Sequence, residues 1–132
     1  MKRSKPIRVL LAKPGLCTHE SGVKLLAAGL RDAGMEVIYT GVFQTREAIT
    51  QIAMEEDVDI VGLSFLNGGH VQLTEAVVNA LNEAGLGSKP VIVGGIIPES
   101  DLPLLRDAGA KGIYAPGTTV ETIAEDIVKL LQ

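Results

Sequence analysis

The chain has 132 residues, of which 46% are hydrophobic, and its 12 Lys and Arg against 16 Asp and Glu give a net charge of −4. This length suits one domain with a full hydrophobic core and is too short for two ordinary domains. Because the basic residues are scattered and aromatic residues are few, the composition argues against a nucleic-acid-binding surface and against platforms for stacked bases.

Cysteine usage and hydropathy bear on the compartment. Cys17 is the single cysteine, so no intramolecular disulfide can form, which suits a reducing cytoplasm. No apolar run approaches the roughly 20 residues of a membrane span. The basic N-terminus precedes an apolar run that is too short for a secretory signal and ends at Lys13. We therefore expect a cytoplasmic protein with no membrane partner.

Short apolar or β-branched runs alternate with helical patterns along the whole chain. The first helical pattern begins near Val23, and Gly34 is expected to end it because glycine tolerates a left-handed cap. Thr45 is expected to cap the second pattern. Pro98 and Glu99 are expected to open the fourth. The runs expected to form strands are 7–12, 36–40, 59–64, 90–93 and 112–115, and the third and last helical patterns contain 73–84 and 123–131.

Strict alternation of strand and helix predicts an α/β fold with helices on both faces of a parallel sheet. Right-handed crossovers leave few topologies. We therefore predict a flavodoxin-like (Rossmann-like) three-layer sandwich with a five-stranded parallel sheet in the order 2-1-3-4-5. Since no repeat, low-complexity tract or linker interrupts the pattern, residues 1–132 are expected to form a single domain, with residues 1–5 as a disordered tail.

In such a sheet, ligands bind at the carboxyl ends of the strands. The loops expected there are 13–22, 64–70, 94–98 and 116–119, and each of them contains glycine, which lets a ligand or another backbone approach closely. The first loop also offers the His19 imidazole, the Cys17 thiol and the Lys13 ammonium. Taken singly, these features also fit plain turn geometry, a solvated histidine and a small buried thiol. His70 reads as a polar residue near the start of the third helix.

The sequence resembles the cobalamin-binding domain of adenosylcobalamin-dependent mutases, the methylmalonyl-CoA mutase class, from Ile7 to Leu131. That family carries Asp-x-His-x-x-Gly after strand one, Ser-x-Leu after strand three and Gly-Gly after strand four. The corresponding residues here are Cys17-Thr18-His19-Glu20-Ser21-Gly22, Ser64-Phe65-Leu66 and Gly94-Gly95. The flanking segments 43–45, 68–70, 97–99 and 114–118 are similar as well.

The resemblance implies a set of cofactor-binding residues and one metal ligand. His19 would ligate cobalt from below in place of the cofactor's own base, and Ser64 would hydrogen-bond the displaced dimethylbenzimidazole tail. Leu66 would shape the slot for that tail, while Gly94 and Gly95 would give it clearance. The cofactor-binding residues implied in this way are Lys13, Cys17, His19, Gly22, Ser64, Leu66, Gly68, Gly94, Gly95, Tyr114, Gly117 and Thr118.

One departure from the family concerns the ligating histidine. The family's Asp, which accepts a hydrogen bond from that histidine, is replaced by Cys17, while Lys13 keeps the position of the lysine behind it. A neutral thiol is a poor acceptor, and the outer partners of a metal-bound histidine set its orientation and basicity. The relay here would therefore run from Lys13 through Cys17 to His19.

The family's known role implies a cofactor subunit of an intramolecular transferase. A domain of this size resembles the small subunit of two-subunit acyl-CoA mutases, which carries adenosylcobalamin while a separate barrel subunit binds the acyl-CoA. No catalytic residues are then expected in this chain. We also expect it to form a hetero-oligomer with the barrel subunit. The alternative is a non-catalytic cobalamin carrier or sensor. A receiver-type signalling domain is excluded, because the carboxylates that it needs at the strand ends are absent from this chain. A zinc site on Cys17 and His19 is excluded as well, because a tetrahedral site needs further ligands.

Overall fold

The structure, a computed structural model, describes residues 5–14, 21–42, 44–65 and 69–132. It contains a five-stranded parallel sheet in the order β2-β1-β3-β4-β5, which confirms the predicted topology. Apart from Lys5, the expected tail lies outside these residues. In chain order the elements are β1 (Arg8–Ala12), α1 (Ser21–Asp32), β2 (Glu36–Tyr39), α2 (Arg46–Glu55), β3 (Ile60–Phe65), α3 (His70–Glu83), β4 (Val91–Gly95), the 3-10 helix η1 (Glu99–Asp101), α4 (Leu102–Asp107), β5 (Ala110–Tyr114) and α5 (Val120–Leu130).

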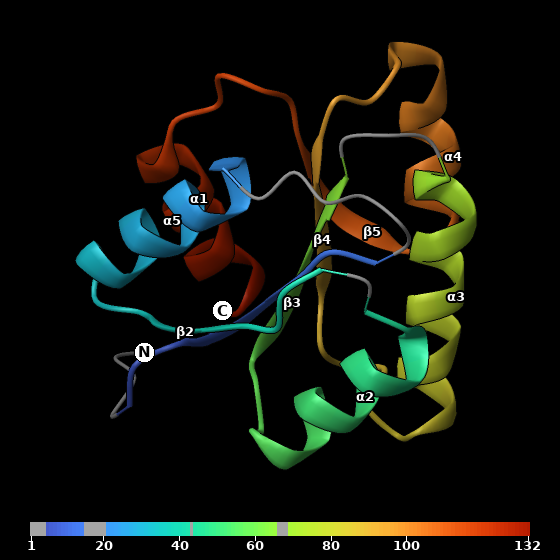
Figure 1. The fold of residues 1–132 in the computed structure, drawn as a ribbon, viewed down its shortest axis with the longest axis horizontal. Coiled ribbons are helices and arrows are strands. Elements are labelled where there is room, and N and C mark those ends of the chain that lie inside the picture. The colour runs from blue at the N-terminus through green and yellow to red at the C-terminus, as the bar shows by residue number, and fades with distance from the viewer. Residues whose placement is uncertain (1–4, 15–20, 43, 66–68) are drawn as a thin grey trace.

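Two helical layers cover the sheet, as Figure 1 shows: α1 and α5 lie on one face, and α2, α3 and α4 on the other. Because side chains alternate along a strand, each layer has its own hydrophobic core. Val9 and Leu11 face α1 and α5, whereas Leu10 and Val61 face α2 and α3. The central strands are buried on both faces, which explains their near-continuous apolar sequences.

The predicted helix boundaries hold at two of three positions. Gly34 has a φ of +93° just after α1 ends, and the Thr45 hydroxyl accepts from the Ala48 amide at 3.1 Å, capping α2. The fourth helix differs from the prediction. Pro98 precedes a short 3-10 turn, and the regular helix α4 begins only at Leu102. Within the described residues, no helix is both long and apolar enough to cross a membrane.

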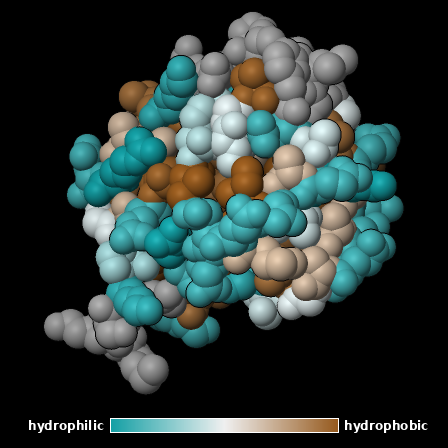
Figure 2. Space-filling view, turned by 60° about the horizontal axis from the view of Figure 1, so that its bottom comes forward, coloured by the Kyte–Doolittle hydropathy of each residue, from teal (hydrophilic) through white to brown (hydrophobic). Residues whose placement is uncertain are grey.

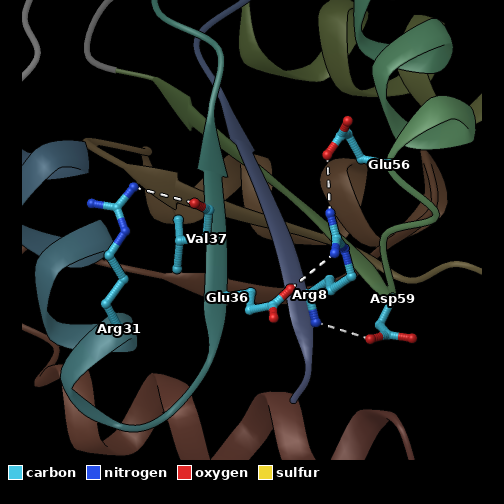
Figure 3. Close-up of polar contacts among 6 residues, drawn as sticks. All are labelled: Arg8, Arg31, Glu36, Val37, Glu56 and Asp59. Atoms are coloured by element: carbon cyan, nitrogen blue, oxygen red, sulfur yellow. Dashed lines mark hydrogen bonds and ion pairs between the residues drawn. The ribbon is translucent and has the colours of Figure 1, made fainter. Parts of the chain in front are cut away.

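The amino ends of the strands are tied together by Arg8 (Figure 3). Its guanidinium contacts Glu36 at 2.9 Å and Glu56 at 3.0 Å, and its backbone amide donates to the Asp59 carboxylate at 2.9 Å. The molecule seen from this end is mostly hydrophilic, with a small hydrophobic patch ringed by hydrophilic residues (Figure 2). Arg8 therefore joins β1, β2, α2 and the entrance to β3 at the edge opposite the expected site.

Candidate functional site

A pocket of about 530 Å³ lies at the carboxyl ends of the strands, between the sheet and helices α1 and α5. Its volume is within the range of small-molecule sites. Eight of the residues that the sequence singles out line it, and these are Lys13, Gly22, Ser64, Gly94, Gly95, Tyr114, Gly117 and Thr118. The four others, Cys17, His19, Leu66 and Gly68, lie outside the described residues.

Strand alternation and register bring these residues to one face. Lys13 follows β1 two positions after Leu11, which also lines the pocket, and Ser64 lies near the end of β3. In the sheet Ser64 pairs with Gly94, and Gly94 pairs with Tyr114. Three neighbouring strands therefore present a hydroxyl, an open position and an aromatic ring side by side.

The two adjacent glycines of β4 are accommodated for different structural reasons. A Cβ atom at Gly94 would have the Tyr114 carbonyl oxygen as its nearest neighbour, at 3.7 Å, so the space above this glycine belongs to the pocket. At Gly95, φ is +138° and a Cβ atom would lie 1.7 Å from the Phe65 carbonyl oxygen. Gly95 is therefore required by the backbone of β3, and the open space for a ligand is found at Gly94.

Lys13 is the most buried charged residue of the pocket. The residue is 1% exposed, and its ammonium nitrogen lies 3.4 Å from the Ser64 hydroxyl oxygen. Within the described part of the chain, this hydroxyl is the partner that the structure gives it. An ammonium group buried in an apolar setting is costly unless hydrogen-bonded, so its placement against Ser64 marks this end of the pocket as polar.

Tyr114 contributes its ring to the pocket and turns its hydroxyl toward α5. The hydroxyl donates to the Asp126 carboxylate at 3.2 Å. Burial, and then the nearby charge and hydrogen bond of Asp126, raise the pKa of Tyr114 to about 12. Asp126 belongs to none of the sequence motifs. Its position on the polar side of α5, one residue before the buried Ile127, is the only signal that the sequence offers.

Apolar side chains from two helices complete the pocket. Helical spacing alone does not separate a core position from a pocket wall, so the sequence does not mark these residues as lining a site. Leu25 and Ile96, by contrast, stand at the mouth of the pocket with 72% and 58% of their surface exposed. The buried or half-buried wall residues are Val23 and Leu26 of α1 and Val120 and Ile123 of α5.

A second hollow, of about 450 Å³, lies at the opposite edge near Lys89 and Lys111. It contains none of the residues that the sequence singles out. Among the described residues, no three His, Cys, Asp or Glu side chains gather in a way that could hold a metal ion. The predicted cobalt ligand and the rejected zinc pair both fall on residues outside that part of the chain.

The fold and the pocket agree with a sequence comparison that defines the class of the protein. Residues 7–124 match the family described as the B12 binding domain, so the chain belongs to the B12-binding domain family. Within it, the small subunits of acyl-CoA mutases are similar over nearly the full length. The pivalyl-CoA mutase small subunit of Xanthobacter autotrophicus is 44% identical, across 98% of this chain and 86% of its own. The 2-hydroxyisobutanoyl-CoA mutase small subunit of Aquincola tertiaricarbonis is 41% identical, across 96% of this chain and 93% of its own.

Larger relatives and solved structures carry the same fold. The methylmalonyl-CoA mutase large subunit of Propionibacterium freudenreichii is 42% identical over 95% of this chain, which spans 17% of that protein. A cobalamin-binding protein from Desulfitobacterium hafniense superimposes with a TM-score of 0.83 at 22% identity, covering 97% of this chain and 60% of that one. The NarL receiver domain of Mycobacterium tuberculosis also superimposes, with a TM-score of 0.71 at 16% identity. At these identities the two structures bear on the fold alone.

Proposed function

We propose that this chain is the cobalamin-binding small subunit of an adenosylcobalamin-dependent acyl-CoA mutase, and that it holds the cofactor with the benzimidazole tail displaced from cobalt. The observation that supports this most is the pocket beside Ser64 and Gly94, whose lining contains eight residues of the family pattern. Two small subunits of acyl-CoA mutases, each more than 40% identical over nearly the whole chain, support the enzyme class.

The residues present fit a flat heteroaromatic tail. Such a ring needs apolar walls and a donor for its ring nitrogen, since an unpaired buried polar atom is costly. The pocket supplies walls from α1 and α5, a hydroxyl at Ser64, and an open position at Gly94. Thr118 is a weaker candidate for this donor, because its hydroxyl already donates to the Ala115 carbonyl at 2.7 Å.

On this proposal His19 is the lower ligand of cobalt, with Cys17 and Lys13 behind it. An imidazole is a suitable ligand for a borderline transition metal. When bound, adenosylcobalamin supplies the radical chemistry through its cobalt–carbon bond. The chain's own residues bind the cofactor, orient it and keep its tail out of water. A carrier or sensor that binds cobalamin without supporting a mutase is the alternative that the test below separates.

The acyl-CoA would be bound by a large, barrel-type partner subunit. Leu25 and Ile96, exposed at the mouth of the pocket, are the apolar residues that this partner or the cofactor would cover. Mixed with the cognate barrel subunit and adenosylcobalamin, the chain should support carbon-skeleton rearrangement, and neither subunit should do so alone. Turnover by the isolated chain would contradict the assignment. Binding of cobalamin without turnover in the mixture would favour a carrier or sensor.

The tail pocket is tested by replacing Gly94. Gly94→Val would place methyl groups in the open space, so it should weaken cobalamin binding by about 10-fold or more while leaving the binding of cobinamide, which lacks the tail, unchanged. Gly94→Ala, for which the nearest atom would lie at an ordinary contact distance of 3.7 Å, should have a smaller effect. The measurement is titration of each corrinoid, followed by absorbance and calorimetry, with thermal unfolding as a check on folding. Equal loss for cobalamin and cobinamide would place the tail elsewhere.

A further inference from the structure

The contact between Lys13 and Ser64 determines how the Ser64 hydroxyl is oriented. An ammonium group can donate hydrogen bonds but cannot accept them. With the Lys13 nitrogen 3.4 Å from the Ser64 oxygen, the hydroxyl must therefore turn its oxygen toward Lys13 and its hydrogen away. The distance is long for a hydrogen bond, but the positive charge orients the hydroxyl dipole in the same sense.

The surroundings of this pair determine where that hydrogen can point. Both residues line the 530 Å³ pocket, and Lys13 is 1% exposed, so little water screens its charge. Ser64 pairs in the sheet with Gly94, which has no side chain to accept a hydrogen bond. The Ser64 hydroxyl hydrogen is therefore available to whatever occupies the space above Gly94.

We propose that Lys13 is a positioning residue for the cofactor tail: it fixes Ser64 as a hydrogen-bond donor, so that the pocket selects lower bases with an unprotonated ring nitrogen. This deepens the proposed function and rests on it, since it assigns to Lys13 a role toward the tail in addition to its place behind Cys17 and His19. The ligand class that follows is a neutral benzimidazole or related azole. A phenolic lower base has no ring nitrogen and would leave the Ser64 donor without a partner.

A double-mutant cycle with two cofactors tests this role. The probes are cobalamin and a phenolylcobamide, which keeps a bulky tail but lacks the accepting nitrogen. For cobalamin we expect Ser64→Ala to weaken binding by about 10-fold and Lys13→Met by about fivefold. The double variant should lose about 10-fold, well short of the product of about 50-fold, because Lys13 acts through Ser64. For phenolylcobamide, Ser64→Ala should weaken binding by no more than about twofold. Lys13→Met should weaken it clearly less than it weakens cobalamin binding, because only the place of Lys13 behind Cys17 and His19 is then lost.

The controls separate this role from the two obvious rivals. If Lys13 acted only through Cys17 and His19, its loss would weaken both cobamides equally, and the proposal would be wrong. Fully multiplicative losses of Lys13 and Ser64 would overturn it as well. Lys111→Met makes the same chemical change at an exposed lysine outside the pocket and should leave both affinities unchanged.

A substitute variant and the affinities of the wild type cover the remaining outcomes. If Lys13→Met does not fold, as judged by thermal unfolding, Lys13→Gln provides a neutral side chain of similar reach, and the same cycle applies. A wild-type chain that binds no cobalamin would contradict the proposed function itself. Binding of cobalamin and phenolylcobamide with equal affinity by the wild type would contradict the selection of an azole base alone.

Discussion

Cys17 is the residue at which this chain departs from the Asp-x-His-x-x-Gly signature. In place of a carboxylate, the second ring nitrogen of His19 would face a thiol, which accepts hydrogen bonds weakly. The imidazole would then be less well oriented and less basic than a ligating histidine that faces a carboxylate. On the proposed function, the pocket around Ser64 and Gly94 would provide a separate source of affinity, so the weaker lower ligand would be tolerated.

Restoring the carboxylate should therefore strengthen the cobalt ligand. We expect Cys17→Asp to tighten His-on cobalamin binding by about 10-fold, whereas the neutral control Cys17→Ser should not. His19→Ala should abolish the His-on absorption spectrum. All four proteins can be compared in one absorbance titration with cobalamin. An unchanged spectrum of His19→Ala would show that His19 is not the ligand.

Tyr114 gives the pocket a group with a measurable pH dependence. Because its pKa is raised to about 12 from an ordinary value of 10.0, the folded state favours the neutral phenol. This contribution to stability is fully present below pH 10 and is lost as the pH rises from about 10 to about 12. Its physical causes are burial and the carboxylate of Asp126.

Asp126→Asn should lower the pKa of Tyr114 toward its ordinary value, with burial keeping part of the shift. Ultraviolet difference spectroscopy of tyrosinate formation measures it, in a Tyr39→Phe background that leaves Tyr114 as the single tyrosine. A pKa that does not move would mean that Asp126 contributes nothing to the shift.

Among the elements, the start of α3 is joined to the turn before α4 by a short contact between His70 and Asp101. His70, 6% exposed at the start of α3, has its Nε2 atom 2.6 Å from the Asp101 carboxylate in η1. Its Nδ1 atom is buried without a hydrogen-bond partner among the described residues. Among the described residues, Asp101 is therefore the side-chain hydrogen-bond partner of this imidazole.

Removing the carboxylate should leave both ring nitrogens of His70 unpaired. We expect Asp101→Ala to lower the free energy of unfolding by about 1–3 kcal/mol. Glu99→Ala, in the same turn and at an exposed position, should change it by no more than about 0.5 kcal/mol. Urea denaturation of the two variants compares them directly. Equal values would mean that the contact adds no stability.

The elements also show where sequence reasoning succeeds and where it fails. The order of strands and most of the pocket lining follow from alternation, since parallel strands must place their carboxyl ends at one edge. The 3-10 turn before α4 and the burial of His70 depend on contacts between α3 and residues about 30 positions away, which local patterns do not contain. The need for glycine at position 95 is also invisible to local patterns, because it arises from the Phe65 carbonyl of the neighbouring strand.

At the scale of the whole molecule, the sheet separates two hydrophobic layers, and the pocket extends one of them. The layer under α1 and α5 is closed by side chains near Leu11 and Ile123 and opens above Gly94. A ligand there would complete the packing between the sheet and both helices. Binding should therefore stabilise the fold as well as place the cofactor.

This linkage predicts a shift in thermal unfolding. A ligand that binds only the folded chain adds about 2.7 kcal/mol at a free concentration 100 times its dissociation constant. Cobalamin should therefore raise the unfolding temperature in a concentration-dependent manner. Gly94→Val, with its side chain in the pocket, should show a smaller rise at equal concentration. A rise of the same size in both proteins would place the stabilising contacts outside the tail pocket.

The opening above Gly94 has a consequence for the life of the protein in a cell. A chain whose packing is completed by its cofactor exposes its unfolded form to proteases more often when that cofactor is scarce. The amount of the chain would then follow the supply of corrinoid without any dedicated regulator. Pulse-chase labelling of cells grown with and without corrinoid would measure this coupling as a difference in half-life.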